Sequence, residues 1–227
     1  MVYIISDIHG EYDLFIELLR KINFSINDEM IICGDIIDKG RDSVKLLRLI
    51  KSFPAFRCII GNHEYEFLKY YWQMMQDSPE DFDGVLIKLQ EYFPYDGRLL
   101  DWDIVDWLES LPYYIERDKF ICVHAGIPVD VESRCLRLSE TTREELVYDR
   151  NFKEPKLIPN TEKCIFFGHT PTSYISEKAE IIKYKKPNEI TDTISSYAKI
   201  HLDLGVWLHG RLGCFCVDTC EEFYVER

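Results

Sequence analysis

The sequence has no apolar run long enough to cross a bilayer, and its start lacks the basic region and the cleavage site of a secretory leader. We therefore expect no membrane association and a cytoplasmic location. Basic residues are also scarce, because 27 lysines and arginines stand against 40 aspartates and glutamates, and the net charge is −13. A general nucleic-acid binder carries a basic surface, so we expect no nucleic-acid partner.

The eight cysteines do not form a disulfide or zinc pattern. Cys214, Cys216 and Cys220 are close together, but their spacing lacks the fourth ligand of the usual zinc sites. Four others lie within apolar runs, where a thiol packs as a small hydrophobic group: Cys33, Cys58, Cys122 and Cys164. We expect reduced cysteines in the core.

The 227 residues, of which 46% are hydrophobic, suffice for one sizeable α/β domain over 1–227, and no linker or repeat divides the chain. The first three apolar runs alternate with helical patterns, which is the β-α-β-α-β order of a parallel sheet. From residue 200 onward short runs are separated by glycines, which indicates antiparallel hairpins. A mixed sheet, or two packed sheets, is therefore expected. The strand-like runs are residues 2–5, 30–33, 56–60, 120–123, 164–167, 200–204, 214–217 and 223–225.

Two segments each allow two interpretations. Residues 79–112 are rich in aromatic and acidic side chains, and they form either amphipathic helices on the sheet or a cap over one side of a site. Residues 176–196 are polar and carry four lysines, which favours a solvated surface loop over a substrate-contacting one.

Polar turns follow five of the apolar runs. Ser6-Asp7-Ile8-His9-Gly10 follows the first, and Asp7 and His9 can face the same side because residues i and i+2 do so in extended chain. The second turn carries Asp35 and Asp38 between glycines. Alone, either turn is weak evidence for a metal site, since an Asp/Gly turn that caps a helix has similar residues.

The third turn is Gly61-Asn62-His63-Glu64, between an apolar run and a helical pattern. Asn62 and His63 are neighbours, so their side chains should point in different directions, one toward a metal and the other toward a substrate. In open α/β sheets, ligands bind at this edge.

Histidine placement connects these turns. Four of the six histidines stand just past successive apolar runs: His9, His63, His124 and His169. If the strands share a sheet, the residues converge at one edge. The donors are then imidazole, carboxylate and amide oxygen without thiolate, which suits Mn²⁺, Fe or Zn²⁺ better than Ca²⁺ or Cu(I).

With these residues in place, the chain resembles the phosphoprotein-phosphatase family of calcineurin-like metallophosphoesterases. The resemblance is closest to the small bacterial and phage branch of serine/threonine phosphatases and symmetrical bis(5′-nucleosyl)-tetraphosphatases. The family motifs GDxHG, GDxxDRG, GNHE, HAG and GH match, in order, residues 6–10, 34–40, 61–64, 124–126 and 168–169. The resemblance implies an α/β fold of two packed mixed sheets flanked by helices.

The resemblance also implies two divalent metal ions, with Mn²⁺ expected before Fe or Zn²⁺. It assigns Asp7 and His9 to the first ion, Asp35 to both, and Asn62, His124 and His169 to the second. It makes His63 the general acid and Asp38 the residue that orients it. Two such ions bind phosphoryl oxygens and activate a water for in-line attack.

One departure concerns phosphate binding. Lys39 stands where the family has arginine, and lysine is a compact point charge rather than a bidentate donor. Arg41 is a second candidate, and Arg150 resembles a further phosphate-binding arginine of bacterial relatives. His201 and Asp203 are either partners of the metal ligands or part of a plain strand.

These residues predict a metal-dependent phosphoesterase acting on phosphomonoesters, with phosphoserine or phosphothreonine in proteins as the first expectation. The alternative is a symmetrical dinucleoside-polyphosphate hydrolase using the same site. A third hypothesis, an inactive metal-binding module, is disfavoured because Asp35, Asn62 and His63 are all present. The expected partner is thus a phosphorylated substrate, either a phosphoprotein or a nucleotide.

Overall fold

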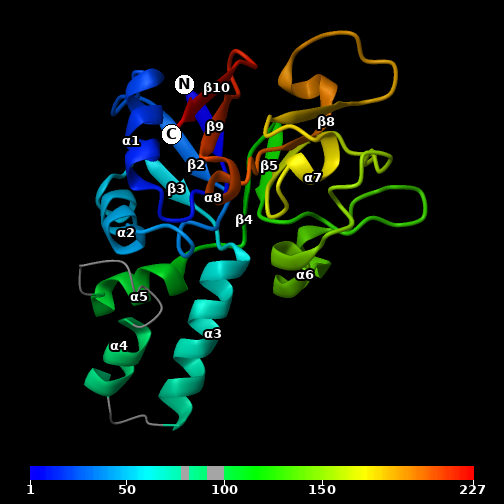
Figure 1. The fold of residues 1–227 in the computed structure, drawn as a ribbon. Coiled ribbons are helices and arrows are strands. Elements are labelled where there is room, and N and C mark those ends of the chain that lie inside the picture. The colour runs from blue at the N-terminus through cyan, green and yellow to red at the C-terminus, as the bar shows by residue number, and fades with distance from the viewer. Residues whose placement is uncertain (78–81, 91–99) are drawn as a thin grey trace.

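The computed structural model describes residues 1–77, 82–90 and 100–227. Two five-stranded mixed sheets lie side by side, and helices flank them (Figure 1). The first sheet has the order β10 (Glu222–Glu226), β9 (Arg211–Cys216), β1 (Val2–Ile5), β2 (Glu29–Ile32) and β3 (Phe56–Cys58). The second has the order β4 (Tyr114–Glu116), β5 (Phe120–Val123), β6 (Cys164–Phe167), β8 (Tyr197–His201) and β7 (Ile182–Lys185). The predicted two-sheet architecture is thus confirmed.

The helices of the described chain include two that connect the parallel strands of the first sheet. These are α1 (Tyr12–Lys21) and α2 (Ser43–Ser52), which cover its outer face in Figure 1. The others are α3 (Asn62–Asp77), α4 (Phe82–Gln90), α5 (Trp102–Ser110), α6 (Arg143–Tyr148), α7 (Ser173–Ser176) and α8 (Val206–His209), with 3₁₀ turns at Leu138–Glu140 and Ile194–Ser196. None of the helices in the described ranges is both long and apolar enough to cross a membrane.

Strand alternation explains how the sheets pack. Ile4 on β1 and Ile31 on β2 are fully buried in the cluster between the sheets, with Phe166 of β6 and Phe215 of β9. Ile5, one residue after Ile4, belongs instead to the cluster on the helical side. Because successive side chains of a strand point to opposite faces, an unbroken apolar run serves both layers.

The parallel strands determine where polar turns meet. β1 pairs with β2 and β2 with β3, all parallel, and in the other sheet β5 pairs with β6 and β6 with β8 in the same way. The carboxyl ends of parallel neighbours lie at one edge of a sheet. The turns that follow β1, β2, β3, β5 and β6 therefore come together.

The prediction of a solvated loop over 176–196 is wrong in part, because the segment contains β7. This strand pairs antiparallel with β8, with Lys183 opposite Ile200. Tyr184 is buried while Lys183 is exposed, so the strand has the alternation of a sheet edge. Lysines on an edge strand protect it from pairing with other chains, and here they gave it the composition of a loop.

The two interpretations of residues 79–112 are not decided. In the described part, α5 is joined to α2 by ion pairs of Lys51 with Asp103 and of Arg48 with Asp101 (2.5 Å), and to α3 by the hydrogen bond from Trp72 to Glu109. These contacts are those of helices packed on neighbouring helices. Residues 78–81 and 91–99 lie outside the described residues, and the capping role stays a prediction.

Candidate metal centre

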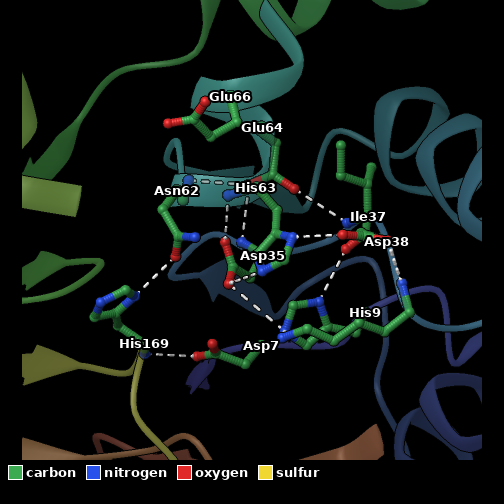
Figure 2. Close-up of polar contacts among 12 residues, drawn as sticks. Asp7, His9, Asp35, Ile37, Asp38, Asn62, His63, Glu64, Glu66 and His169 are labelled. Carbon is green, nitrogen blue, oxygen red and sulfur yellow. Dashed lines mark hydrogen bonds and ion pairs between the residues drawn. The ribbon is translucent and has the colours of Figure 1, made fainter. Parts of the chain in front are cut away.

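The predicted metal ligands lie together at the shared edge of the two sheets. Figure 2 shows Asp7, His9 and Asp35 from the turns after β1 and β2, Asn62 and His63 at the start of α3, and His169 from the turn after β6. His124 follows β5 and contacts the same group, since its Nε2 is 3.4 Å from Asp35 Oδ1. All are buried except Asn62 and His63, which are partly exposed.

The backbone at this edge is strained. Asp7, His9, Asp35 and His169 have φ values of 53°, 47°, 52° and 71°, in the left-handed region that residues other than glycine rarely occupy. Such strain persists only where surrounding contacts enforce it, and it is concentrated at functional sites. These left-handed residues stand where the strands end, and their side chains point toward the centre of the site.

Glycine allows two of the turns to approach each other. A Cβ atom on Gly61 would lie 2.3 Å from the amide nitrogen of Asp35, which is closer than real contacts allow. The turn after β3 can therefore lie against the turn after β2 only if residue 61 has no side chain. This approach places Asn62 and His63 beside Asp35.

A first ligand cluster contains Asp35 Oδ2. It lies 3.6 Å from His9 Nε2 and 3.7 Å from His63 Nε2. His9 Nδ1 is 2.9 Å from the carbonyl oxygen of Ile37, so it carries the proton and the lone pair of Nε2 faces the cluster. Burial lowers the pKa of His9 well below its ordinary value, so Nε2 stays unprotonated and accepts a hydrogen bond from Lys39 Nζ at 2.9 Å.

A second cluster surrounds Asn62. Its Oδ1 lies 2.9 Å from His124 Nε2 and 2.7 Å from His169 Nδ1. His124 Nδ1 donates to the carbonyl of Cys33 at 2.7 Å, so in a neutral ring Nε2 has no proton to offer Asn62. Two acceptor atoms, His124 Nε2 and Asn62 Oδ1, therefore face each other, an arrangement that a cation stabilises.

His169 is also available as a ligand. Burial and, next, the neighbouring His124 lower its pKa to about 2, so the ring is neutral. Its Nε2 is buried and has no hydrogen-bond partner within the described residues. Its backbone amide donates to Asp7 Oδ2 at 3.1 Å, which holds the turn after β6 against the turn after β1.

The buried carboxylates at this edge favour binding of a cation. Burial raises the pKa of Asp35 well above its ordinary value, and the nearby carboxylate of Asp7 raises it further. Two groups of donor atoms lie within 4.8 Å of one another, one formed by His9, Asp35 and His63 and the other by Asp7, Asp35 and His124. Because both groups contain Asp35, the donor set fits two cations that share this carboxylate.

His63 and Asp38 form a pair at the exposed side of the centre. His63 Nδ1 lies 2.8 Å from Asp38 Oδ2, while Asn62 points the other way, toward His169 (Figure 2). Burial lowers the pKa of His63, but the hydrogen bond to Asp38 and the charge of Asp35 outweigh it, and the net shift is upward. The hydrogen bond from His63 lowers the pKa of Asp38 to about 2, so Asp38 stays ionised.

Glu64 has a role that the sequence analysis missed. This fully buried carboxylate accepts hydrogen bonds from four backbone amides: those of Asp35 (2.8 Å), Ile36 (2.7 Å), Ile37 (3.0 Å) and Gly61 (2.9 Å). It therefore joins the turn after β2 to the start of α3. The available signal was a carboxylate in the first turn of a helix that follows a buried strand.

The three predicted phosphate-binding residues differ in position. Lys39 reaches the centre, with Nζ 2.9 Å from His9 Nε2. Arg41 is exposed and lines a neighbouring cavity, and no hydrogen bond or ion pair joins it to a predicted ligand within the described chain. Arg150 is exposed just beyond α6, and its charge contributes to the lowered pKa of His169. The structure therefore brings Lys39 to the metal ligands, and Arg41 does not join it there.

His201 and Asp203 pack behind the turn after β6. The buried His201 ring stacks on Phe167 with 4.3 Å between the ring centroids. Asp203 accepts hydrogen bonds from the amide of Gly205 through its side chain (2.7 Å) and from Thr172 through its carbonyl (2.8 Å). Both residues support the segment that carries His169.

Comparison with known families agrees with this geometry. A family model described as calcineurin-like phosphoesterase matches residues 1–205. The chain belongs to the calcineurin-like phosphoesterase family. The predicted family resemblance is thus confirmed, and the match covers every residue placed at the centre.

Curated relatives carry the name symmetrical bis(5′-nucleosyl)-tetraphosphatase. One from Aggregatibacter actinomycetemcomitans is 28% identical over 155 residues, which are 66% of this chain and 53% of the relative. Another from Wigglesworthia glossinidia brevipalpis is 35% identical over 129 residues, 55% of this chain and 44% of the relative. The chain thus matches about half the length of these relatives.

Solved structures share the fold. The crystal structure of a protein provisionally named a diadenosine tetraphosphatase matches with a TM-score of 0.72 and 20% identity, covering 99% of this chain and 92% of the other. A protein serine/threonine phosphatase from Saccharomyces cerevisiae matches with a TM-score of 0.55 and 16% identity, covering 94% and 71%. At these identities, the matches show the shared architecture alone.

Proposed function

We propose that this chain is a metal-dependent hydrolase that cleaves a dinucleoside polyphosphate symmetrically. The observation that carries the proposal is that Asp35 belongs to both groups of closely spaced donor atoms at this sheet edge, one with His9 and His63 and one with Asp7 and His124. In this proposal Asp7 and His9 would hold one divalent ion, Asn62, His124 and His169 would hold the other, and Asp35 would be a ligand of both. The nitrogen and oxygen donors suit Mn²⁺, with Fe and Zn²⁺ as alternatives.

The relatives favour a nucleotide over a phosphoprotein. The sequence analysis put a serine/threonine phosphatase first, but the curated relatives described above are named as tetraphosphatases. The protein serine/threonine phosphatase among the solved structures described above is 16% identical and supports the fold alone. The alternative from the sequence analysis therefore becomes the main proposal.

The chain's own residues provide positioning and proton transfer. When bound, two such ions would supply electrostatic stabilisation of the phosphoryl oxygens and would lower the pKa of a bound water. His63 keeps a proton because Asp38 holds Nδ1, and its Nε2 faces the centre to protonate the leaving oxygen. Lys39 places an ammonium group beside the ligands, where it neutralises phosphate charge in a protein whose net charge is −13.

The test is a parallel assay of chelator-stripped protein reloaded with Mn²⁺. Diadenosine tetraphosphate and a phosphothreonine peptide are supplied separately, and ADP and phosphate are quantified. We expect ADP from the dinucleotide, only after metal is restored, and little phosphate from the peptide. Turnover of the peptide alone would return the proposal to a protein phosphatase, and no turnover of either by protein with two bound metals would exclude both substrates.

A further inference from the structure

A cavity of about 470 Å³ lies next to the metal centre, and of its lining residues Lys39 alone has a role in the mechanism above. Its walls come from residues 10–13, after β1, and 39–42, before α2, together with Trp207 of α8 and Arg227. Small-molecule sites in proteins have volumes of roughly 300–1,000 Å³, so the cavity is large enough for a nucleoside.

Lys39 connects the cavity to the centre. Its Nζ is 2.9 Å from His9 Nε2 and 5.1 Å from the centroid of the Trp207 ring. One ammonium group therefore touches a predicted metal ligand and an aromatic wall of the cavity. A substrate whose phosphates bind at the metal centre can extend beyond Lys39 and place its nucleoside against the indole of Trp207.

The cavity and the centre are held by the same backbone. The amide of Gly10 donates to Ile36 O at 2.7 Å, and that of Gly40 donates to His9 O at 2.9 Å. A Cβ atom on Gly40 would lie 2.1 Å from His9 O, so these turns are in direct contact. The position of the cavity relative to the ligands is thus set by the turns that carry them.

The cavity is lined by charges of both signs and by two aromatic rings, those of Tyr12 and Trp207. Trp207 is 42% exposed, and a large exposed aromatic ring offers a base a stacking surface. A second ring, that of Tyr12, lies under Lys45 Nζ at 3.6 Å. Asp13 and Asp42 also line the cavity and can accept hydrogen bonds from the hydroxyl or amino groups of a nucleoside, while Arg41 and Arg227 add positive charge.

We propose that this cavity binds the nucleoside of the substrate, with the base against Trp207 and the phosphates running past Lys39 to the metals. The inference rests on the proposed nucleotide substrate and adds the residues that recognise it. Trp207 is a binding residue in this assignment, because it contacts the base and not the reacting phosphorus.

The chain offers a matched control. Leu208, the next residue of α8, is 41% exposed but does not line the cavity. Trp207→Ala and Leu208→Ala are compared with the unmodified protein, all loaded with Mn²⁺. Hydrolysis of diadenosine tetraphosphate and of p-nitrophenyl phosphate is measured, and calorimetry compares the binding of ADP with that of pyrophosphate, which has the same two phosphates without a nucleoside.

In Trp207→Ala, we expect the ratio of kcat/KM for the dinucleotide to that for p-nitrophenyl phosphate to fall about tenfold. The preference for ADP over pyrophosphate should fall by a similar factor. Leu208→Ala should leave both ratios within about twofold of the unmodified protein, as expected for a surface change.

The outcomes separate this inference from the proposed function. Dinucleotide hydrolysis with equal ratios in both variants would overturn the cavity assignment and leave the function standing. Binding of ADP that depends on Trp207, without dinucleotide hydrolysis, would overturn the function and support the cavity. Failure of the unmodified protein to prefer ADP over pyrophosphate would overturn the cavity assignment whatever the hydrolysis result.

Discussion

The two ends of the paired sheets differ in how their charges are arranged. At the metal end, Asp7 and Asp35 are buried beside histidines whose lone pairs face inward. At the opposite end lies a larger cavity, about 590 Å³, lined by groups such as Arg117 and Glu29. Arg117 and Glu29 are paired with each other there at 3.0 Å, and the Arg117 side chain is 43% exposed.

The comparison shows that the volume of a cavity does not by itself indicate where the candidate active site lies. Charges that are paired and exposed to water are already stabilised, so they exert little demand for a ligand. Carboxylates that are buried together without a matching cation favour binding of one. We therefore expect the reaction at the metal end, and changes there should have much larger effects.

The largest effect is expected for Asp35→Asn. Because Asp35 belongs to both ligand clusters, its loss should reduce bound metal from about two ions per chain to about one or none, with activity near background. Metal analysis and dinucleotide hydrolysis measure this. Asp106→Asn, an exposed change on α5, is the control. Near-normal activity in Asp35→Asn would show that the residue does not bridge.

A smaller effect is expected for His63→Asn. The side chain faces the exposed side of the centre and is held by Asp38, so metal should stay bound while turnover falls by ~10²–10⁴-fold, the range for one general acid. Metal content and kcat are measured on the same samples. Loss of metal in this variant would make His63 a ligand and contradict the assignment.

Glu64→Gln tests how the metal end is held in place. Gln presents an NH₂ group to amides that now donate to a carboxylate, so the variant should lose about 1.5–3 kcal/mol of unfolding free energy. Denaturant unfolding without added metal measures this. Glu66→Gln, exposed two residues later on α3, should cost ~0.5 kcal/mol or less. Equal effects in the two variants would refute the supporting role of Glu64.

The smallest effect is expected at the opposite end. Arg117→Ala removes an exposed ion pair with Glu29, which should change unfolding free energy by ~0.5 kcal/mol or less and leave metal content and hydrolysis unchanged. Thermal unfolding and the dinucleotide assay measure this. A marked fall in hydrolysis would contradict this comparison, because it would show that residues of the larger cavity affect activity at the metal centre.

Sequence patterns predicted strand positions best where a strand is buried on both faces. The runs at 2–5, 120–123 and 164–167 match β1, β5 and β6 residue for residue, because unbroken apolar runs identify strands buried on both faces. β8 was predicted at 200–204 but spans Tyr197–His201, because Lys199 interrupts the apolar pattern. Lys199 is fully buried, and its ammonium donates to the carbonyls of Phe152 (2.5 Å) and Glu154 (2.9 Å).

The sequence by itself determined which residue types stand at the ends of the strands, and therefore the donor set of the candidate centre. Alternation and turn residues are local properties, and they are sufficient for this. Tertiary structure alone decided that Glu64 supports the loop after β2 and that Lys39 joins His9 to Trp207. Those contacts connect segments distant in the chain, and the packing of two sheets, which no local pattern encodes, determines their distances.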